Sequence, residues 1–265
     1  MAHYIAKKIV QDFEINGDVR KAPWSDATWS ESFVDMATGE KPRLLTKSAI
    51  LWSDQKLYVA FWAEEPEVQA EISVRDELIF LENDLELFID GGDCYYEFEI
   101  NALGTIYEVF FIWRDSFPDS IKFPPELFDP LGPNSYTFAG DYDRTGATFW
   151  KGTHPRGVRW AFRDFDMSGL KSAVKVYGSL NDPSVIDEGW GVEISIPWAS
   201  LSHLADGRAL PPKDGDIWRF FLGRFQKEYR DGLEVFPHPA SSLTSHGVYD
   251  THQPEKWAQI EFSRY

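Results

Sequence analysis

Basic residues are scarce in this sequence, and their scarcity limits the partners that its surface can attract. The 265 residues include 26 lysines and arginines against 43 aspartates and glutamates, which gives a formal net charge of −17 at pH 7. A surface that is this acidic repels nucleic acid backbones and anionic lipid head groups. We therefore expect no nucleic acid partner and no membrane partner. Neutral sugars carry no charge and are not repelled by such a surface.

Cysteine, methionine and long apolar runs are also nearly absent. Cys94 is alone, which excludes an intrachain disulfide and a cysteine metal cluster, and the three methionines stand in no haem-binding motif. No window of about 18 apolar residues predicts a membrane span, and the first 13 residues lack the apolar stretch of a signal peptide. If Met1 is the natural start, we expect a cytoplasmic protein; otherwise, we expect a secreted protein whose signal peptide has been removed.

Helical periodicity is scarce too, and short alternating runs rich in Val, Ile, Phe, Tyr and Trp take its place. A helical turn is expected only after Ile196, where a strand should stop at Pro197. With 43% hydrophobic and 16% aromatic residues the chain can bury a large core, so we predict one all-β domain over residues 1–265. The predicted strands lie within 49–63 as a hairpin bent at 53–55, and at 84–90, 95–101, 105–113, 173–178, 191–196, 217–225 and 258–262.

The stretch 114–165 differs from the rest because it carries six prolines, many aromatics and no sustained periodicity. A structureless stretch of that length is uncommon inside a compact domain and often serves as a binding loop or lid. Its aromatic residues argue against a flexible linker, so we predict an ordered excursion over one end of the sandwich.

Alternation sorts the two central strands into faces. One face of the two strands is apolar and is predicted to face the core: Leu85, Leu87 and Ile89 in 84–90, and Tyr96, Phe98 and Ile100 in 95–101. The opposite face carries most of the carboxylates. Like charges on adjacent strands destabilise a sheet. The carboxylate face therefore either meets bulk water, binds cations or is kept for a ligand, and we favour a ligand. Its members include Glu86, Glu97, Glu99 and Asn101.

Several short motifs follow one another along nearly the whole chain. They are FEINGD at 13–18 with Trp24, LWSD at 51–54, LYVAF at 57–61, EEP at 64–66, RD at 75–76, NDLELFID at 83–90, YEFEIN at 96–101, GSLN at 178–181, GWGVEI at 189–194, IPW at 196–198 and HQPEKW at 252–257. In this order they resemble the family 9 carbohydrate-binding modules. The Arg114–Phe165 excursion is the part that most members of that family lack.

That resemblance implies a jelly-roll-like antiparallel β-sandwich related to the DOMON group. It also implies a sugar site in which two aromatic rings enclose the sugar and polar side chains bind its hydroxyls. Glu86, Glu65 and Asn101 match polar positions of the family site, whereas Glu99 stands where sugar-binding members carry a basic residue. Phe80 falls near the first sandwiching tryptophan. The second sandwiching tryptophan of the family falls near Leu243 or Tyr249, where this chain has no tryptophan. Trp113, Trp150 and Trp160, in or beside the excursion, are therefore candidates for the second ring.

The physical argument for a sugar does not depend on the resemblance. Sugar rings present apolar C–H patches to aromatic faces, and their hydroxyls pair with planar polar side chains. Arg75 and Arg224 are expected near the carboxylate face, although each is equally well explained as an ion-pair partner.

Glycoside hydrolases also use paired carboxylates, one as acid and the other as nucleophile or base. The alternative function is therefore a saccharide-active enzyme that uses Glu97, Glu99 and Glu86.

No cofactor is required for sugar binding, but the resemblance implies structural calcium in some family members. The turn after 84–90 could hold Ca²⁺ through Asp90 and Asp93, or it is a plain hairpin turn. His238, His246 and His252 match no ligand spacing, and His252 is read as a hydrogen-bonding loop residue. The sequence does not determine the oligomeric state.

Overall fold

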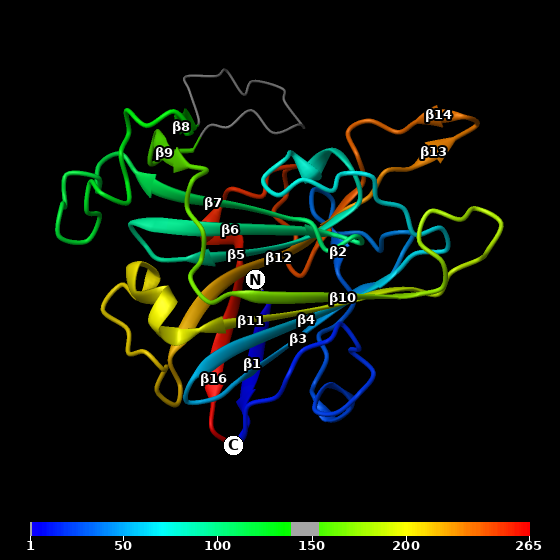
Figure 1. The fold of residues 1–265 in the computed structure, drawn as a ribbon, viewed down its shortest axis with the longest axis horizontal. Helices are drawn as coiled ribbons and strands as arrows, with labels where there is room; N and C mark the ends of the chain where they lie inside the picture. Colours follow the sequence, from blue (N-terminus) through cyan, green and yellow to red (C-terminus); the bar gives the residue numbers. More distant parts are fainter. Residues whose placement is uncertain (1, 139–153) are drawn as a thin grey trace.

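The computed structural model describes residues 2–138 and 154–265, whose regular secondary structure is mostly β-strand (Figure 1). None of the helices in these ranges has the length and apolar character needed to cross a bilayer. The short 3-10 helices are η1 (Trp24–Asp26), η2 (Ile79–Leu81), η3 (Trp198–Leu204) and η4 (Pro254–Lys256). The strands are β1 (His3–Lys8), β2 (Val34–Asp35), β3 (Thr46–Trp52), β4 (Lys56–Glu64), β5 (Asp84–Asp90), β6 (Cys94–Asn101), β7 (Ile106–Trp113), β8 (Ser135–Phe138), β9 (Arg159–Phe162), β10 (Lys171–Tyr177), β11 (Gly189–Pro197), β12 (Ile217–Phe225), β13 (Tyr229–Arg230), β14 (Leu233–Glu234), β15 (Ala240–Ser242) and β16 (Ala258–Ser263).

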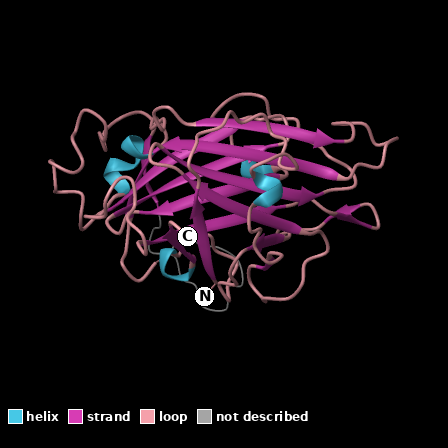
Figure 2. Ribbon diagram, turned by 90° about the horizontal axis from the view of Figure 1, so that it is seen from below, coloured by secondary structure: helices cyan, strands magenta, loops and turns pink. Residues whose placement is uncertain are grey.

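The strands form two layers. One runs β10-β11-β4-β3 and the other runs β12-β5-β6-β7-β9-β8, and β1 and β16 connect them through continuous hydrogen bonding (Figure 1). The helices are short beside the long strands that make up these layers (Figure 2). Strand β1 pairs in parallel with both β16 and β3, whereas the other pairings of the described strands are antiparallel. The predicted all-β, antiparallel sandwich is therefore confirmed.

Alternation creates the core between the layers. Val59 and Phe61 of β4 and Val192 of β11 belong to the same buried cluster as Leu87 of β5 and Phe98 of β6. Successive side chains of a strand point to opposite faces, so one apolar residue in two is enough to fill this space. The predicted stop is also confirmed, since β11 ends at Pro197 and η3 begins at once.

The outer face of the second layer is buried as well. Phe88, Tyr95, Phe111, Phe221 and Trp257 form a second buried cluster on that face. Loops that follow β12 and precede β5 cover it. Because both faces of β5 and β6 are covered, the polar side chains on the outer face lie inside the protein rather than in bulk water.

The excursion contains more regular structure than the sequence indicates. Strands β8 and β9 lie within it and extend the second layer beyond β7. The sequence shows no sustained periodicity at these eight positions, because four-residue strands are too short to show a clear alternation. Elsewhere in the excursion, Phe123 and Phe128 are fully buried in the main core, so its described parts pack on the sandwich.

Candidate ligand-binding cavity

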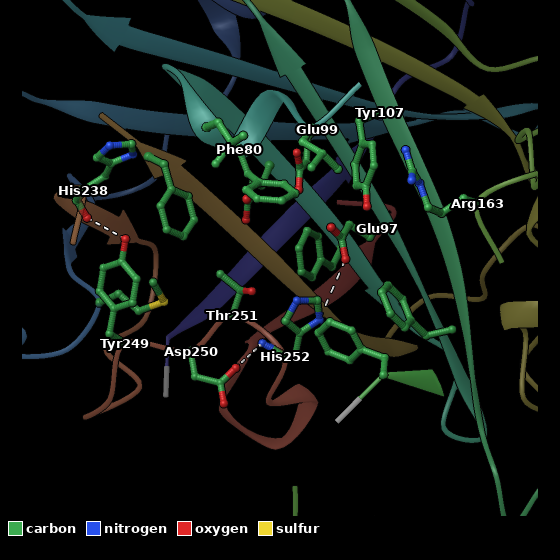
Figure 3. A pocket seen from close by; sticks show the side chains of 18 of the residues that line it. Phe80, Glu97, Glu99, Tyr107, Arg163, His238, Tyr249, Asp250, Thr251 and His252 are labelled. Carbon is green, nitrogen blue, oxygen red and sulfur yellow. Dashed lines mark hydrogen bonds and ion pairs between the residues drawn. The ribbon is translucent and has the colours of Figure 1, made fainter. Parts of the chain in front are cut away.

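A cavity of about 430 Å³ opens over the outer face of β5, β6 and β7 (Figure 3). This volume lies within the range of small-molecule sites, toward its lower end. Strands supply its floor, while η2, β8 and the segment 225–252 supply its walls. The cavity therefore sits on the face where alternation gathers the carboxylates.

The floor of the cavity is acidic. Glu86 pairs with Glu99 across β5 and β6, and Phe88 pairs with Glu97, so the three glutamates share one face. All three are buried, with exposures of 2%, 1% and 4% for Glu86, Glu99 and Glu97. The Oε2 atom of each has no hydrogen-bond partner among the described residues. A ligand that donates hydrogen bonds would find acceptors here.

The walls are aromatic. The rings of Phe80 and Tyr107 meet edge to face at 6.1 Å between centroids, and Phe80 is 37% exposed, which leaves part of its surface open to a ligand. Arg163 also lines the cavity, with its guanidinium 5.6 Å from the Tyr107 ring. Besides Phe80 and Tyr107, the rings that line the cavity are Phe88, Phe111, Tyr136, Phe138, Phe225, Phe236 and Tyr249.

Burial changes the acidity of the floor. Desolvation raises the pKa of Glu97 to about 7, although Glu99 and Arg159 act in the opposite sense. Desolvation also raises the pKa of Glu86 well above its usual range, with repulsion from Asp84 and Glu97 adding to it. The pKa of Glu99 is raised in the same way, by burial first and then by its acidic neighbours. The floor therefore holds carboxyl groups that keep protons at unusually high pH.

Three carboxylates come especially close together. Asp84, Glu86 and Glu99 each offer one oxygen, and these oxygens lie within 4.8 Å of one another. Asp84 is fully buried beneath the floor, and its Oδ1 accepts a hydrogen bond from the backbone N–H of Phe225 at 3.2 Å. The strand period places Asp84 and Glu86 on one face of β5, and the register brings Glu99 beside them.

His252 borders the floor on the opposite side of the cavity from Phe80 (Figure 3). Its Nδ1 lies 3.1 Å from the Tyr95 hydroxyl and 3.8 Å from Glu97 Oε2. Arg159 donates to the same hydroxyl at 2.8 Å. Burial lowers the pKa of His252 well below its usual range, and the charge of Arg159 lowers it further. His252 is therefore neutral at pH 7 and serves as a hydrogen-bonding group.

The structure places four of the predicted site residues at this cavity, namely Phe80, Glu86, Glu97 and Glu99. Asn101 is not among the lining residues, because its side chain organises the following turn. Its amide donates to Ile72 O at 2.7 Å and to Glu82, and its Oδ1 accepts from Leu103 N at 3.1 Å. The match of Asn101 to a polar position of the family site therefore corresponds to a structural hydrogen bond in this chain.

Glu65 and Arg224 lie elsewhere. They form a buried ion pair at 3.1 Å, and the Trp190 indole N–H donates to Glu65 at 2.7 Å. Glu65 lines a second, polar cavity of about 430 Å³ that includes Glu82. Arg224 alternates with Gly223 along β12, so its side chain points to the opposite face from the first cavity.

The remaining predicted residues are also engaged away from the cavity. Arg75 pairs with Glu108 and Asp166. Trp113 is buried under the guanidinium of Arg159, which lies 4.6 Å from its ring, and Trp160 packs toward the main core. These two tryptophans are not among the lining residues, and Trp150 lies outside the described residues.

Asp90 and Asp93 flank a tight turn. Asp90 Oδ1 accepts the N–H of Gly92 at 2.9 Å, and Gly92 has the positive φ of +70° that favours glycine. Asp93 pairs with Lys122 at 3.2 Å and with Arg156 at 3.0 Å. Basic partners therefore neutralise Asp93, and the close carboxylate group in the described residues is the one at Asp84, Glu86 and Glu99.

Sequence reasoning missed most of the walls. Tyr107 could have been found, because it faces Glu99 in the β6–β7 register and therefore shares the carboxylate face. Tyr136 and Phe138 reach the cavity from a short edge strand, where no periodicity predicts a direction. The family resemblance puts the second ring near Leu243 or Tyr249, and Tyr249 does line the cavity. His252 was interpreted as a hydrogen-bonding loop residue, and it does bond, but its place beside Glu97 depends on how the loop 243–253 folds back.

No family model matches the sequence, and no curated protein matches it. Solved structures do resemble the whole fold. A protein from Bacteroides uniformis, described as a candidate carbohydrate-binding protein, is 13% identical with a TM-score of 0.63, and the match covers 99% of each chain. A family 9 carbohydrate-binding module from Caldicellulosiruptor kristjanssonii in complex with cellotriose is 12% identical with a TM-score of 0.54, covering 99% of this chain and 94% of that one.

The same module in complex with glucose is also 12% identical with a TM-score of 0.54, and the match covers 98% of this chain and 96% of the module. Identities this low establish the likeness of fold and nothing about the ligand. The chain has the β-sandwich fold of the family 9 carbohydrate-binding modules.

Proposed function

We propose that this protein binds a neutral mono- or oligosaccharide in the cavity above β5, β6 and β7. The observation that carries the proposal is the pairing of an aromatic wall with buried carboxylate oxygens that have no hydrogen-bond partner among residues 2–138 and 154–265. Aromatic faces suit the C–H patches of a sugar ring, and carboxylates accept hydrogen bonds from its hydroxyls. The likeness of fold to modules that bind glucose and cellotriose supports the same function.

The charge of the cavity narrows the ligand class. Glu86, Glu97 and Glu99 line the cavity. Arg163 also lines it, but its guanidinium donates a hydrogen bond to the backbone oxygen of Asp76. An anionic sugar would meet buried acids rather than a basic pocket. A neutral sugar avoids this repulsion, and its hydroxyls can replace the water that burial removes from the floor.

The proposal can be tested by ligand-observed NMR with a panel of mono- and oligosaccharides, followed by calorimetry on each binder. Phe80→Ala should weaken binding roughly two- to tenfold, because a lost aromatic contact is worth about 0.5–1.5 kcal/mol. Glu97→Gln should weaken it as well, because the amide keeps one acceptor oxygen and puts an NH₂ donor in place of the other.

Tyr229→Ala is the matched control, since Tyr229 is an exposed aromatic residue that lines the second cavity and not the first. If Phe80→Ala and Glu97→Gln bind sugars as tightly as the unchanged protein while Tyr229→Ala does not, the second cavity is the site and the proposal is wrong. It is also wrong if no sugar on the panel binds.

The second candidate is an enzyme that acts on a saccharide in the same cavity. The observation in its favour is the pKa of Glu97, which burial raises to about 7 beside other carboxyl groups. A carboxyl group that is protonated near neutral pH can act as a general acid while a neighbour serves as base or nucleophile. Following each NMR sample for a day separates the two functions. New sugar resonances that disappear in Glu97→Gln indicate an enzyme, and unchanged sugars indicate a binding protein.

A further inference from the structure

Three carboxylates beneath the cavity form a compact group, and no basic side chain in the described part of the chain makes an ion pair with any of them. Asp84 and Glu86 extend from the same face of β5, and Glu99 extends from β6 in direct register with Glu86. One oxygen from each lies within 4.8 Å of the other two, and the three side chains are 0%, 2% and 1% exposed.

Each member of this group has an oxygen without a hydrogen-bond partner in the described part of the chain: Asp84 Oδ2, Glu86 Oε2 and Glu99 Oε2. On β12, the residue opposite Glu86 is Gly223, which offers no side chain as a partner. A Cβ added at Gly223 would lie 2.4 Å from the ring of Phe221, so the space there is already filled by an apolar group. Opposite Glu86, β12 thus offers no side chain, and β6 offers another acidic residue, Glu99.

The basic side chains Arg163, His238 and Arg224 bond to groups other than the three carboxylates. Arg163 donates to the backbone of Asp76, and His238 Nε2 lies 2.7 Å from Glu234. Arg224, on the far face of β12, pairs with Glu65. Among the described residues, therefore, no lysine, arginine or histidine forms an ion pair with the three carboxylates. Burying several carboxylates without a counter-charge is costly, and buried charges in proteins are usually paired or bound to metal.

We propose that Asp84, Glu86 and Glu99 bind a calcium ion at the base of the cavity. Calcium takes six to eight oxygen ligands at about 2.3–2.6 Å, so its opposite ligands stand about 4.6–5.2 Å apart. Oxygens within 4.8 Å of one another fit around such an ion. Hard carboxylate oxygens without nitrogen or sulfur donors also favour calcium over zinc or copper.

The ion would retain open coordination positions. Three carboxylates supply three to six oxygens, depending on whether each binds through one oxygen or two, and Glu86 and Glu99 line the cavity whereas Asp84 does not. The positions on the cavity side are then filled by water or by adjacent hydroxyls of a bound ligand. This last step rests on the proposed sugar-binding function, while the ion site itself does not.

Calcium binding is measured directly, without any sugar, by calorimetry on chelator-treated protein and by the luminescence of Tb³⁺. Tb³⁺ takes calcium sites and is sensitised by nearby aromatic residues such as Tyr107, which lines the cavity. We expect one ion per chain. Glu86→Gln and Glu99→Gln should each weaken binding by at least about tenfold, because each removes a charged ligand from the ion.

The paired change Asp90→Asn with Asp93→Asn is the location control, since it removes two carboxylates at the β5–β6 turn, where calcium could also be sought. It should leave calcium affinity unchanged. Each glutamine variant is compared with the unchanged protein for thermal unfolding in chelator, and equal or higher stability shows that a loss of binding is not a loss of folding.

The proposal is overturned if the chelator-treated protein binds neither Ca²⁺ nor Tb³⁺ up to roughly 10 mM, which exceeds the weakest usual range of calcium sites. It is also overturned if the Asp90 and Asp93 pair of changes abolishes binding while the two glutamine variants do not. If glucosamine binds in place of calcium, and Glu99→Gln abolishes that binding, the group is an ammonium site and the calcium proposal is wrong. Calcium binding without any sugar binding would support the ion site and contradict the proposed function alone.

Discussion

The buried carboxyl group of Glu97 should make the stability of this protein depend on pH in an unusual direction. Burial raises the pKa of Glu97 from 4.5 to about 7 in the folded protein. Between these two values the folded state holds a proton that the unfolded state has released. The contribution of Glu97 to the free energy of unfolding should therefore be most favourable below about pH 4.5. It should fall as the pH rises and stay constant above about pH 7.

The size of the effect follows from the same two values. A tenfold change in a proton-binding constant is about 1.4 kcal/mol, so the change from 4.5 to about 7 corresponds to about 3 kcal/mol of lost unfolding free energy at pH 8. Glu97 is only 4% exposed, so solvent screening does not reduce this figure appreciably. The Glu97→Gln variant lacks this group and should be more stable than the unchanged protein at pH 8. For a chain of this size the gain is roughly 5–10 °C in Tm.

The measurement is urea unfolding from pH 4.5 to pH 8 in chelator, for the unchanged protein and for Glu97→Gln. Other groups titrate in the same interval, so the quantity to follow is the difference in unfolding free energy between the two proteins at each pH. Glu40→Gln removes an exposed glutamate outside the cavity and controls for the loss of one negative charge. If the difference between the unchanged protein and Glu97→Gln is constant across the interval, Glu97 is not the buried acid described here and the reasoning is refuted.

Two further predictions concern buried charges outside the cavity. Glu193→Ala should lower the unfolding free energy by about 3 kcal/mol, because Glu193 accepts the Trp24 indole N–H at 2.6 Å and the Gly17 backbone N–H at 2.6 Å; an unchanged urea midpoint would contradict this role. Arg224→Met should cost a similar amount by leaving Glu65 buried without its partner, and combining it with Glu65→Gln should recover part of the loss. Sugar affinity should not change in Arg224→Met, and calorimetry showing a large loss would mean that Arg224 contacts the ligand after all.

The sequence by itself determined most of the long strands and the direction of the side chains in the two central ones. The alternation in 84–90 and 95–101 assigns Leu87 and Phe98 to the core and Glu86, Glu97 and Glu99 to the opposite face, and the structure has them there. This succeeds because the two-residue period of a strand is a local property that neighbouring residues dictate. The predicted stop at Pro197 succeeds for the same reason, since proline lacks the N–H that continues a strand ladder.

The tertiary structure alone decided which polar residues meet. Glu65, Asn101 and Arg224 looked like members of one polar site, but Arg224 points to the other face of its strand and pairs with Glu65, and Asn101 bonds to the backbone of Ile72. Tyr249 and His252 reach the cavity only because the chain after β15 folds back over the sheet. The acidity of Glu97 was likewise hidden, because a carboxylate on a strand face is ordinary in water and unusual only once loops have covered it. Long-range packing, which no local pattern encodes, thus converts a row of surface-like acids into a buried site.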